Sequence, residues 1–221
     1  MRAIRFVMSV CIAVGGLSAF SMSCAHEGHD HAAGMRRAAN AQAHQNDNHE
    51  NATEARRSRY ARSQRAYQVP DVTLINADMR RVRLHDVLAA DNPVMIDFVS
   101  TRCVAACPEI SQAFSMVQNR LGSQGKNLRL ISFFVDPQRD TPAEVKLYAM
   151  RYGAQANWQL LSGGADDIEM VRRAFDVDRD DKASVRPVAL LRPARGKPWL
   201  RIEGSASADD LAAEYRELMR N

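Results

Sequence analysis

Apolar positions in the C-terminal two thirds of the chain follow strand-like spacing in some segments and helical spacing in others. Residues 94–99 and 128–135 are nearly continuous apolar runs, which are typical of strands covered on both faces. Between them, residues 107–121 carry their apolar side chains on one helical stripe. Weaker patterns predict strands at 72–75, 81–84, 158–161, 188–191 and 199–202, and helices at 142–152, 166–175 and from 208 onward.

Two helix starts carry capping sequences. Thr-Pro-Ala-Glu at 141–144 is a capping box with proline at the first helical position, and Ser-Ala-Asp-Asp at 207–210 is a second cap. The order of strands and helices predicts an α/β protein with a thioredoxin-like fold. We expect a central mixed sheet flanked by helices, with an N-terminal β-hairpin extension built from residues 72–84.

The first 25 residues have the pattern of an export signal. Arg2 and Arg5 precede an uncharged apolar stretch at 6–20, and Ser-Cys-Ala at 23–25 fits a signal-peptidase site. A lipid anchor on Cys24 and an uncleaved membrane anchor are the alternatives, although the apolar stretch is shorter than the roughly 20 residues that span a bilayer. We therefore expect an exported, periplasmic protein. Attachment to the outer face of the inner membrane stays open.

Residues 26–66 are polar and contain almost no large aliphatic side chains. Such a composition predicts a disordered linker, so the folded domain is expected at 67–221. The net charge of +4 owes much to arginines in this linker. A basic segment beside anionic lipid explains them, and export argues against nucleic acid as a partner. His26, His29 and His31 are candidate auxiliary metal ligands, and a plain polar spacer is the alternative.

Of the four cysteines, two lie in the N-terminal segment, and the predicted domain keeps only Cys103 and Cys107. This pair follows a predicted buried strand and opens a predicted helix. Helix N-terminal amides stabilise thiolates, which makes the sulfur atoms better nucleophiles and better metal ligands. The pair can bind a soft ion such as Cu(I), close a disulfide or alternate between these states. A purely structural disulfide would close a very short loop and add little stability.

Two motifs resemble those of one protein family. The sequence DFVSTRCVAACP at 97–108 and the sequence DPQRDTP at 136–142 resemble the two signatures of the Sco/SenC family, in the same order. The resemblance implies a thioredoxin fold and copper bound as Cu(I) by Cys103 and Cys107. It also implies a metallochaperone role in assembling the copper centre of cytochrome c oxidase or a related cuproprotein. An oxidase subunit or other cuproprotein and thiol–disulfide exchange partners would then be its partners.

The chain departs from this family at one expected ligand. The resemblance implies a third copper ligand, a histidine, near Ser184 or Val185, but the last histidine of the chain is His85. This departure keeps a second hypothesis open. On that hypothesis the protein is a thiol–disulfide oxidoreductase that reduces the copper-ligand cysteines of a partner, with Cys103 and Cys107 as its catalytic residues.

Two further residues are candidates for flanking the cysteines. Asp136 follows the second buried strand, where a carboxylate could orient a ligand or accept a proton, although turn formation is an alternative role. Pro187 precedes the strand predicted at 188–191, where thioredoxins carry a proline beside their active disulfide. A proline that merely opens a strand is the alternative.

Overall fold

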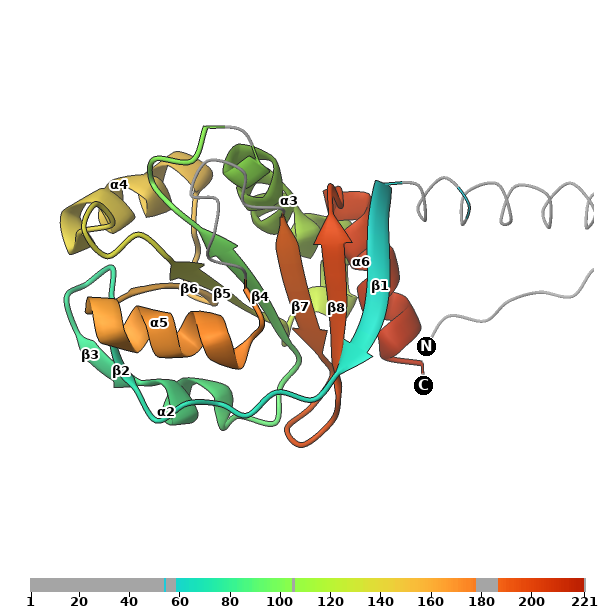
Figure 1. Ribbon diagram of the computed structural model, residues 1–221. Coiled ribbons are helices and arrows are strands. Elements are labelled where there is room, and N and C mark those ends of the chain that lie inside the picture. The colour runs from blue at the N-terminus through green and yellow to red at the C-terminus, as the bar shows by residue number, and fades with distance from the viewer. Residues whose placement is uncertain (1–53, 55–58, 105, 178–186, 221) are drawn as a thin grey trace, which may run out of the picture. The chain divides into compact units, whose positions relative to one another are not determined.

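A mixed eight-stranded sheet organises the protein (Figure 1). The computed structural model describes residues 54, 59–104, 106–177 and 187–220, all within the compact unit Asn48–Asn221. The strands are β1 (Tyr60–Arg65), β2 (Thr73–Asn76), β3 (Arg81–Arg83), β4 (Val94–Val99), β5 (Arg129–Phe134), β6 (Trp158–Ser162), β7 (Val188–Arg192) and β8 (Trp199–Gly204). Their order across the sheet is β1-β8-β7-β4-β5-β6-β2-β3.

Helices cover both faces of this sheet. The helices are α2 (Leu84–Leu88), α3 (Ala106–Leu121), α4 (Pro142–Tyr152), α5 (Ala165–Ala174) and α6 (Ala208–Leu218), with a 3₁₀ turn η1 (Gly122–Gly125) after α3. Buried side chains of α2 and α5 pack with one face of the central strands, and those of α3, α4 and α6 pack with the other. Figure 1 shows α5 in front of the sheet. In the part of the chain that the structure describes, no helix is both long and apolar enough to cross a membrane.

The strand β4 lies in the middle of the sheet, and all six of its side chains are buried. It pairs in parallel with β5 and antiparallel with β7, which makes the sheet mixed. Alternate residues serve the two cores: Ile96 and Phe98 face α2 and α5, whereas Met95 and Val99 face α3 and α6. The predicted thioredoxin-like arrangement of a mixed sheet between helices is therefore confirmed, and β2 and β3 form the predicted N-terminal hairpin.

Both capping sequences start helices, but only that of α6 is a full capping box, because the backbone N–H of Thr141 donates to the carbonyl of Arg139 and not to the Glu144 side chain. The side chain of Thr141 accepts a hydrogen bond from the backbone N–H of Glu144, and Pro142 is the first residue of α4. Ser207 and Asp210 form a reciprocal capping box at the start of α6. Both caps satisfy N–H groups that the first helical turn would leave unpaired.

The folded domain begins earlier than residue 67, so the predicted linker is wrong at its C-terminal end. Tyr60–Arg65 forms the edge strand β1, antiparallel to β8 with Tyr60 opposite Gly204. Only Tyr60 is buried within this strand, which is why apolar patterning missed it. Gly204 has φ of 122°, and a side chain there would collide with the backbone carbonyl of Arg59. The rest of the predicted linker and the predicted signal at 1–25 lie outside the described residues.

Candidate dithiol site

The two cysteines lie on the connection between β4 and α3. A turn follows β4, in which the backbone N–H of Cys103 donates to the carbonyl of Ser100 at 3.2 Å. The backbone N–H of Cys107, in the first turn of α3, donates to the Cys103 sulfur at 3.1 Å. The two Cα atoms are 5.7 Å apart, and the sulfur atoms lie within disulfide-bonding distance. This geometry allows the pair to interconvert between a disulfide and a dithiol.

The two sulfur-bearing residues differ in accessibility. Cys107 is 2 % exposed and belongs to the buried cluster that contains Val99 and Phe114. Cys103 is only partly buried, and Val104 beside it is 91 % exposed. A partner can therefore reach Cys103, whereas Cys107 faces the interior. The amide of Cys107 also favours negative charge on the Cys103 sulfur, as expected at a helix start.

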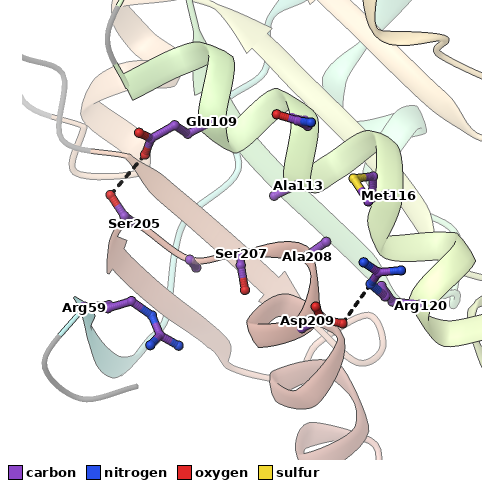
Figure 2. Close-up of a pocket in the computed structure, with 11 residues that line it drawn as sticks. Arg59, Glu109, Ala113, Met116, Arg120, Ser205, Ser207, Ala208 and Asp209 are labelled. Atoms are coloured by element: carbon purple, nitrogen blue, oxygen red, sulfur yellow. Dashed lines mark hydrogen bonds and ion pairs between the residues drawn. The ribbon is translucent and has the colours of Figure 1, made fainter. Parts of the chain in front are cut away.

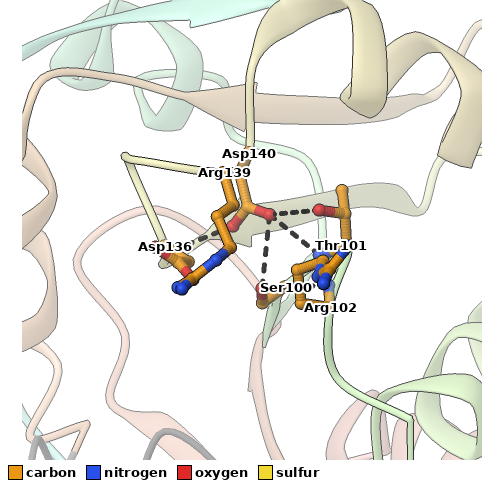
Figure 3. A network of polar contacts seen from close by, with 6 residues as sticks. All are labelled: Ser100, Thr101, Arg102, Asp136, Arg139 and Asp140. Carbon is orange, nitrogen blue, oxygen red and sulfur yellow. Dashed lines mark hydrogen bonds and ion pairs between the residues drawn. The ribbon is translucent and has the colours of Figure 1, made fainter.

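A buried carboxylate ties the loop before Cys103 to the loop after β5 (Figure 3). Asp140 accepts hydrogen bonds from the backbone N–H and the hydroxyl of Thr101, both at 2.8 Å, and from the hydroxyl of Ser100 at 3.3 Å. Its other oxygen accepts from the backbone N–H of Asp136 at 2.8 Å. Burial raises the pKa of Asp140, and the N–H donors oppose that shift. Asp140 thus holds residues 100 and 101, which precede Cys103, against the loop that follows β5.

Asp136 lies at the same edge of the sheet as the loop before Cys103. Since β4 and β5 are parallel, the loops that follow them meet there. The Asp136 carboxylate, which is 14 % exposed, forms an ion pair at 3.0 Å with Arg139, whose side chain is 53 % exposed. The carboxylate that contacts the cysteine loop is therefore that of Asp140. The motif at 136–142 contains both acids, and the sequence analysis named only Asp136 as a candidate flanking residue.

Pro187 also lies near this edge. Asp97 of β4 pairs with Ala189 of β7 in an antiparallel register, so the chain before Ala189 runs alongside the end of β4. The half-buried Pro187 uses its carbonyl to accept a hydrogen bond from the N–H of Gly204 at 2.9 Å. Its peptide bond with Arg186 lies outside the described residues, as does the loop around Ser184 where the family resemblance places a histidine.

Metal-ligating residues are sparse around the cysteines. Among the described residues, no group of three or more His, Cys, Asp or Glu side chains could hold a metal ion. His85 is exposed on α2, which packs on the sheet face opposite α3. His26, His29 and His31 lie outside the described residues. Among the described residues at this site, the two cysteine sulfurs are therefore the candidate metal ligands. Soft sulfur ligands suit Cu(I).

A groove begins at the first turn of α3 (Figure 2). It runs between α3 and the connection from β8 to α6, and Ala113, Met116 and Ala206 contribute apolar lining. Polar contacts cross it: the Ser205 hydroxyl donates to Glu109 at 3.3 Å, and Arg120 pairs with Asp209 at 2.8 Å. The lining carries both signs of charge, Arg59 and Arg120 beside Glu109 and Asp209, so the groove offers no concentration of one sign to attract an ion.

One buried acid of the central strand was not singled out by the sequence analysis. Asp97 is fully buried in β4, and burial raises its pKa to about 7. Neither carboxyl oxygen has a hydrogen-bond partner among the described residues, although the hydroxyl of Ser132 lies near enough to favour the carboxylate slightly. An acidic residue inside an otherwise apolar strand was the available signal.

Fold and site together define a thioredoxin-like protein with a cysteine pair where a central strand leads into a helix. A model of the SCO1/SenC family matches residues 61–189, and the chain belongs to this family. A SCO1 protein homolog of Bacillus subtilis (strain 168) is 32 % identical over 98 residues, which cover 44 % of this chain and 50 % of the relative. The match thus spans half the length of that relative.

Solved structures share the fold. BsSco, described as a member of the Sco family of cytochrome c oxidase assembly proteins with a disulfide switch, has a TM-score of 0.59 at 24 % identity, covering 72 % of this chain and 96 % of BsSco. Copper-bound ScoI of Arabidopsis thaliana has a TM-score of 0.58 at 20 % identity, covering 69 % of this chain and 98 % of ScoI. These likenesses place the eight-stranded sheet and its helices within the fold of Sco proteins.

Proposed function

We propose that this protein handles copper for the assembly of the copper centre of cytochrome c oxidase or a related cuproprotein. The observation that carries the proposal is the placement of Cys103 and Cys107, within bonding distance at the start of α3, with Cys103 accessible. Membership of the SCO1/SenC family supports it, as do a relative described as a cytochrome c oxidase assembly protein and another solved with copper bound.

Copper is the cargo in this proposal, and the reduced cysteine pair holds it as Cu(I). The disulfide must first be reduced, because the thiolate and not the disulfide is the metal ligand. Two thiolates suit Cu(I), whereas Cu(II) would lack the imidazole that it favours. The backbone N–H of Cys107 donates a hydrogen bond to the Cys103 sulfur at the start of α3.

A second candidate function is favoured by the unequal exposure of the two cysteines. An accessible Cys103 and a buried Cys107 are arranged as the attacking and resolving thiols of an oxidoreductase. Such a protein would reduce the copper-ligand cysteines of its partner. Both candidate functions require Cys103 and Cys107 to alternate between the dithiol and the disulfide. They differ in whether the protein also carries copper.

The proposal includes export to the periplasm, with the N-terminal segment as signal or anchor. His26, His29 and His31 would then gather copper near the membrane and pass it to the cysteine pair. Since β1 belongs to the sheet, a deletion that tests this tract should end before residue 59.

Anaerobic titration of the reduced purified protein with Cu(I), against a chromogenic Cu(I) chelator, tests the proposal. We expect one tightly bound Cu(I) that is lost in Cys103→Ser and in Cys107→Ser and is kept when the three histidines are replaced by alanine. His85→Ala is the matched control and should bind as the wild type does. Binding that survives both cysteine substitutions, or no binding by the reduced protein, would overturn the copper proposal.

A further inference from the structure

Three arginines gather at the end of the sheet opposite the cysteines. Arg129 begins β5 and Arg192 ends β7, and both pair with Val94, the first residue of β4. Arg195 follows in the turn between β7 and β8, which Figure 1 shows at the lower end of the sheet. The connection to the cysteines begins after Val99, the last residue of β4, so about 17 Å of strand separates it from these arginines.

Arg129 and Arg192 point to the same face of the sheet. Residues opposite each other on paired strands share a face, and the face of Val94 is the one covered by α2 and α5. Neighbouring strands lie about 4.8 Å apart, so about 10 Å separates the Cα atoms of the two arginines. Only the short side chain of Val94 lies between them on β4. The two long side chains can therefore converge on one ligand.

The Arg192 side chain is almost completely buried and has an unused hydrogen-bond donor. It is 5 % exposed, its guanidinium carbon lies 4.7 Å from the ring centre of Trp199, and its Nη2 donates to the carbonyl of Leu88 at 2.8 Å. Its buried Nε has no hydrogen-bond partner among the described residues. Buried donors are nearly always paired, because the loss of hydration is otherwise not offset. The free Nε therefore points to a ligand that supplies an acceptor.

No nearby acid neutralises this cluster. In the described part of the chain, no carboxylate forms an ion pair with Arg129, Arg192 or Arg195. The exposed Asp91 accepts a hydrogen bond from the backbone N–H of Arg195 at 3.1 Å, and not from a guanidinium. Burial lowers the pKa of Arg192, and the charges of Arg195 and Arg129 lower it further. Since arginine stays protonated in proteins, the repulsion persists until an anion offsets it.

We propose that Arg129, Arg192 and Arg195 form a binding site for a phosphate group. Guanidinium groups match the geometry of phosphate oxygens and bind them through paired N–H···O hydrogen bonds. Arg195 is exposed and Arg129 is half-buried, so a phosphate group can approach the cluster from solvent. Three arginines beside the single acid Asp91 leave an excess of positive charge that suits a phosphate dianion. The site is independent of the proposed dithiol chemistry, because it lies at the other end of β4.

A phosphate group can reach this site from two sources, inorganic phosphate or the headgroup of an anionic lipid. Inorganic phosphate would stabilise the folded protein by offsetting the repulsion among the arginines. A lipid headgroup held here would in addition direct the opposite end of β4, and with it the accessible Cys103, away from the bilayer.

Titration calorimetry of the full-length protein with inorganic phosphate, at pH 7 and at an ionic strength held constant with chloride, tests the site. We expect the affinity of the wild type to fall at least about tenfold in Arg129→Gln and in Arg195→Gln, because each loses charge-assisted hydrogen bonds to the phosphate. Both positions are accessible, so these variants should fold. Arg83→Gln is the matched control, since it removes the same charge from the exposed strand β3 at the far edge of the sheet.

Vesicle flotation distinguishes the two sources, with phosphatidylcholine vesicles that contain or lack phosphatidic acid. Stronger binding to phosphatidic acid by the wild type and Arg83→Gln than by Arg129→Gln and Arg195→Gln would assign the site to a lipid headgroup. Calorimetric binding without that difference would assign it to inorganic phosphate. The proposal is overturned if the wild type binds no phosphate and all four proteins bind vesicles equally, or if Arg83→Gln weakens binding as much as the two cluster variants do.

Discussion

Asp140 accepts a hydrogen bond from the backbone N–H of Thr101 at 2.8 Å, and this contact joins the two loops that meet beside the cysteine pair. Thr101 lies two residues before Cys103, whereas Asp140 ends the loop that follows β5. The motif at 136–142 therefore holds the cysteine-bearing motif at 97–108 in place through the buried carboxylate of Asp140. Four donors converge on this one side chain, so its removal affects both loops.

Replacing Asp140 with alanine should lower the free energy of unfolding by about 2–4 kcal/mol, because buried donors on both loops lose their acceptor. Urea unfolding at pH 7 measures this. The matched control is Asp136→Asn, since the carboxylate of Asp136 pairs with the exposed Arg139 and such pairs contribute about 0–1 kcal/mol. A loss in Asp140→Ala no larger than in the control would show that the network does not hold the loops.

Single cysteine variants should differ in their reactivity toward iodoacetamide. In Cys107→Ser the remaining Cys103 is accessible, so we expect rapid alkylation at pH 7. In Cys103→Ser the remaining Cys107 is almost fully buried, and alkylation should be at least about tenfold slower. Mass spectrometry over time measures both rates. Equal rates in the folded proteins would contradict the assignment of Cys103 as the sulfur that partners meet.

The edge strand β1 should contribute to stability through buried acids of α6. Tyr60 donates to Glu214 at 2.7 Å, and Arg59 pairs with Asp210 at 2.8 Å; both acids are buried. A chain that begins at residue 67 should therefore be less stable than one that begins at residue 48 by about 2 kcal/mol or more. Thermal unfolding of the two proteins measures the difference. The same midpoint in both would show that β1 is dispensable.

Asp97 should make the protein less stable as the pH rises. Its folded pKa of about 7 lies above the ordinary pKa of 3.8, so the folded protein binds more protons than the unfolded chain between these values. The favourable contribution is complete below about pH 4 and is lost as the pH rises through 7. One unit of pKa shift corresponds to about 1.4 kcal/mol, so the change is a few kcal/mol at most.

Urea unfolding between pH 4 and 8 measures this contribution. The unfolding free energy of Asp97→Asn should decline less steeply with pH than that of the wild type, because its amide does not ionise. Parallel curves for the two proteins would contradict a raised pKa at this position.

The main elements could be predicted from the sequence because their residues repeat with clear periods. The continuous apolar run at 94–99 predicted the central strand β4. The caps at Thr141 and Ser207 predicted where α4 and α6 begin. The strand β1 could not be predicted in this way. Its sequence is polar, and it is held by backbone pairing with β8 and by contacts with α6, partners more than 130 residues away in the chain.

The site was predictable only in part, because its contacts also depend on which distant residues the fold brings together. The motif spacing pointed to Cys103 and Cys107, Asp136 was named because it follows the second buried strand, and Pro187 because thioredoxins carry a proline there; the roles of these residues stay predictions. The directions of the side chains within the turn decide which carboxylate contacts the loop before Cys103. In the structure it is that of Asp140, whereas the Asp136 carboxylate pairs with Arg139. The unpaired state of Asp97 depends on what the neighbouring strands and helices supply, which a single sequence does not show.

Copper transfer to a copper-free oxidase domain tests the role of Cys103 and Cys107 most directly. The protein is loaded with Cu(I), mixed anaerobically with the reduced domain, and the absorption of the binuclear copper centre is followed after mild oxidation. We predict that the wild type assembles the centre, whereas Cys103→Ser and Cys107→Ser do not. Assembly at the wild-type rate by both cysteine variants would contradict the account.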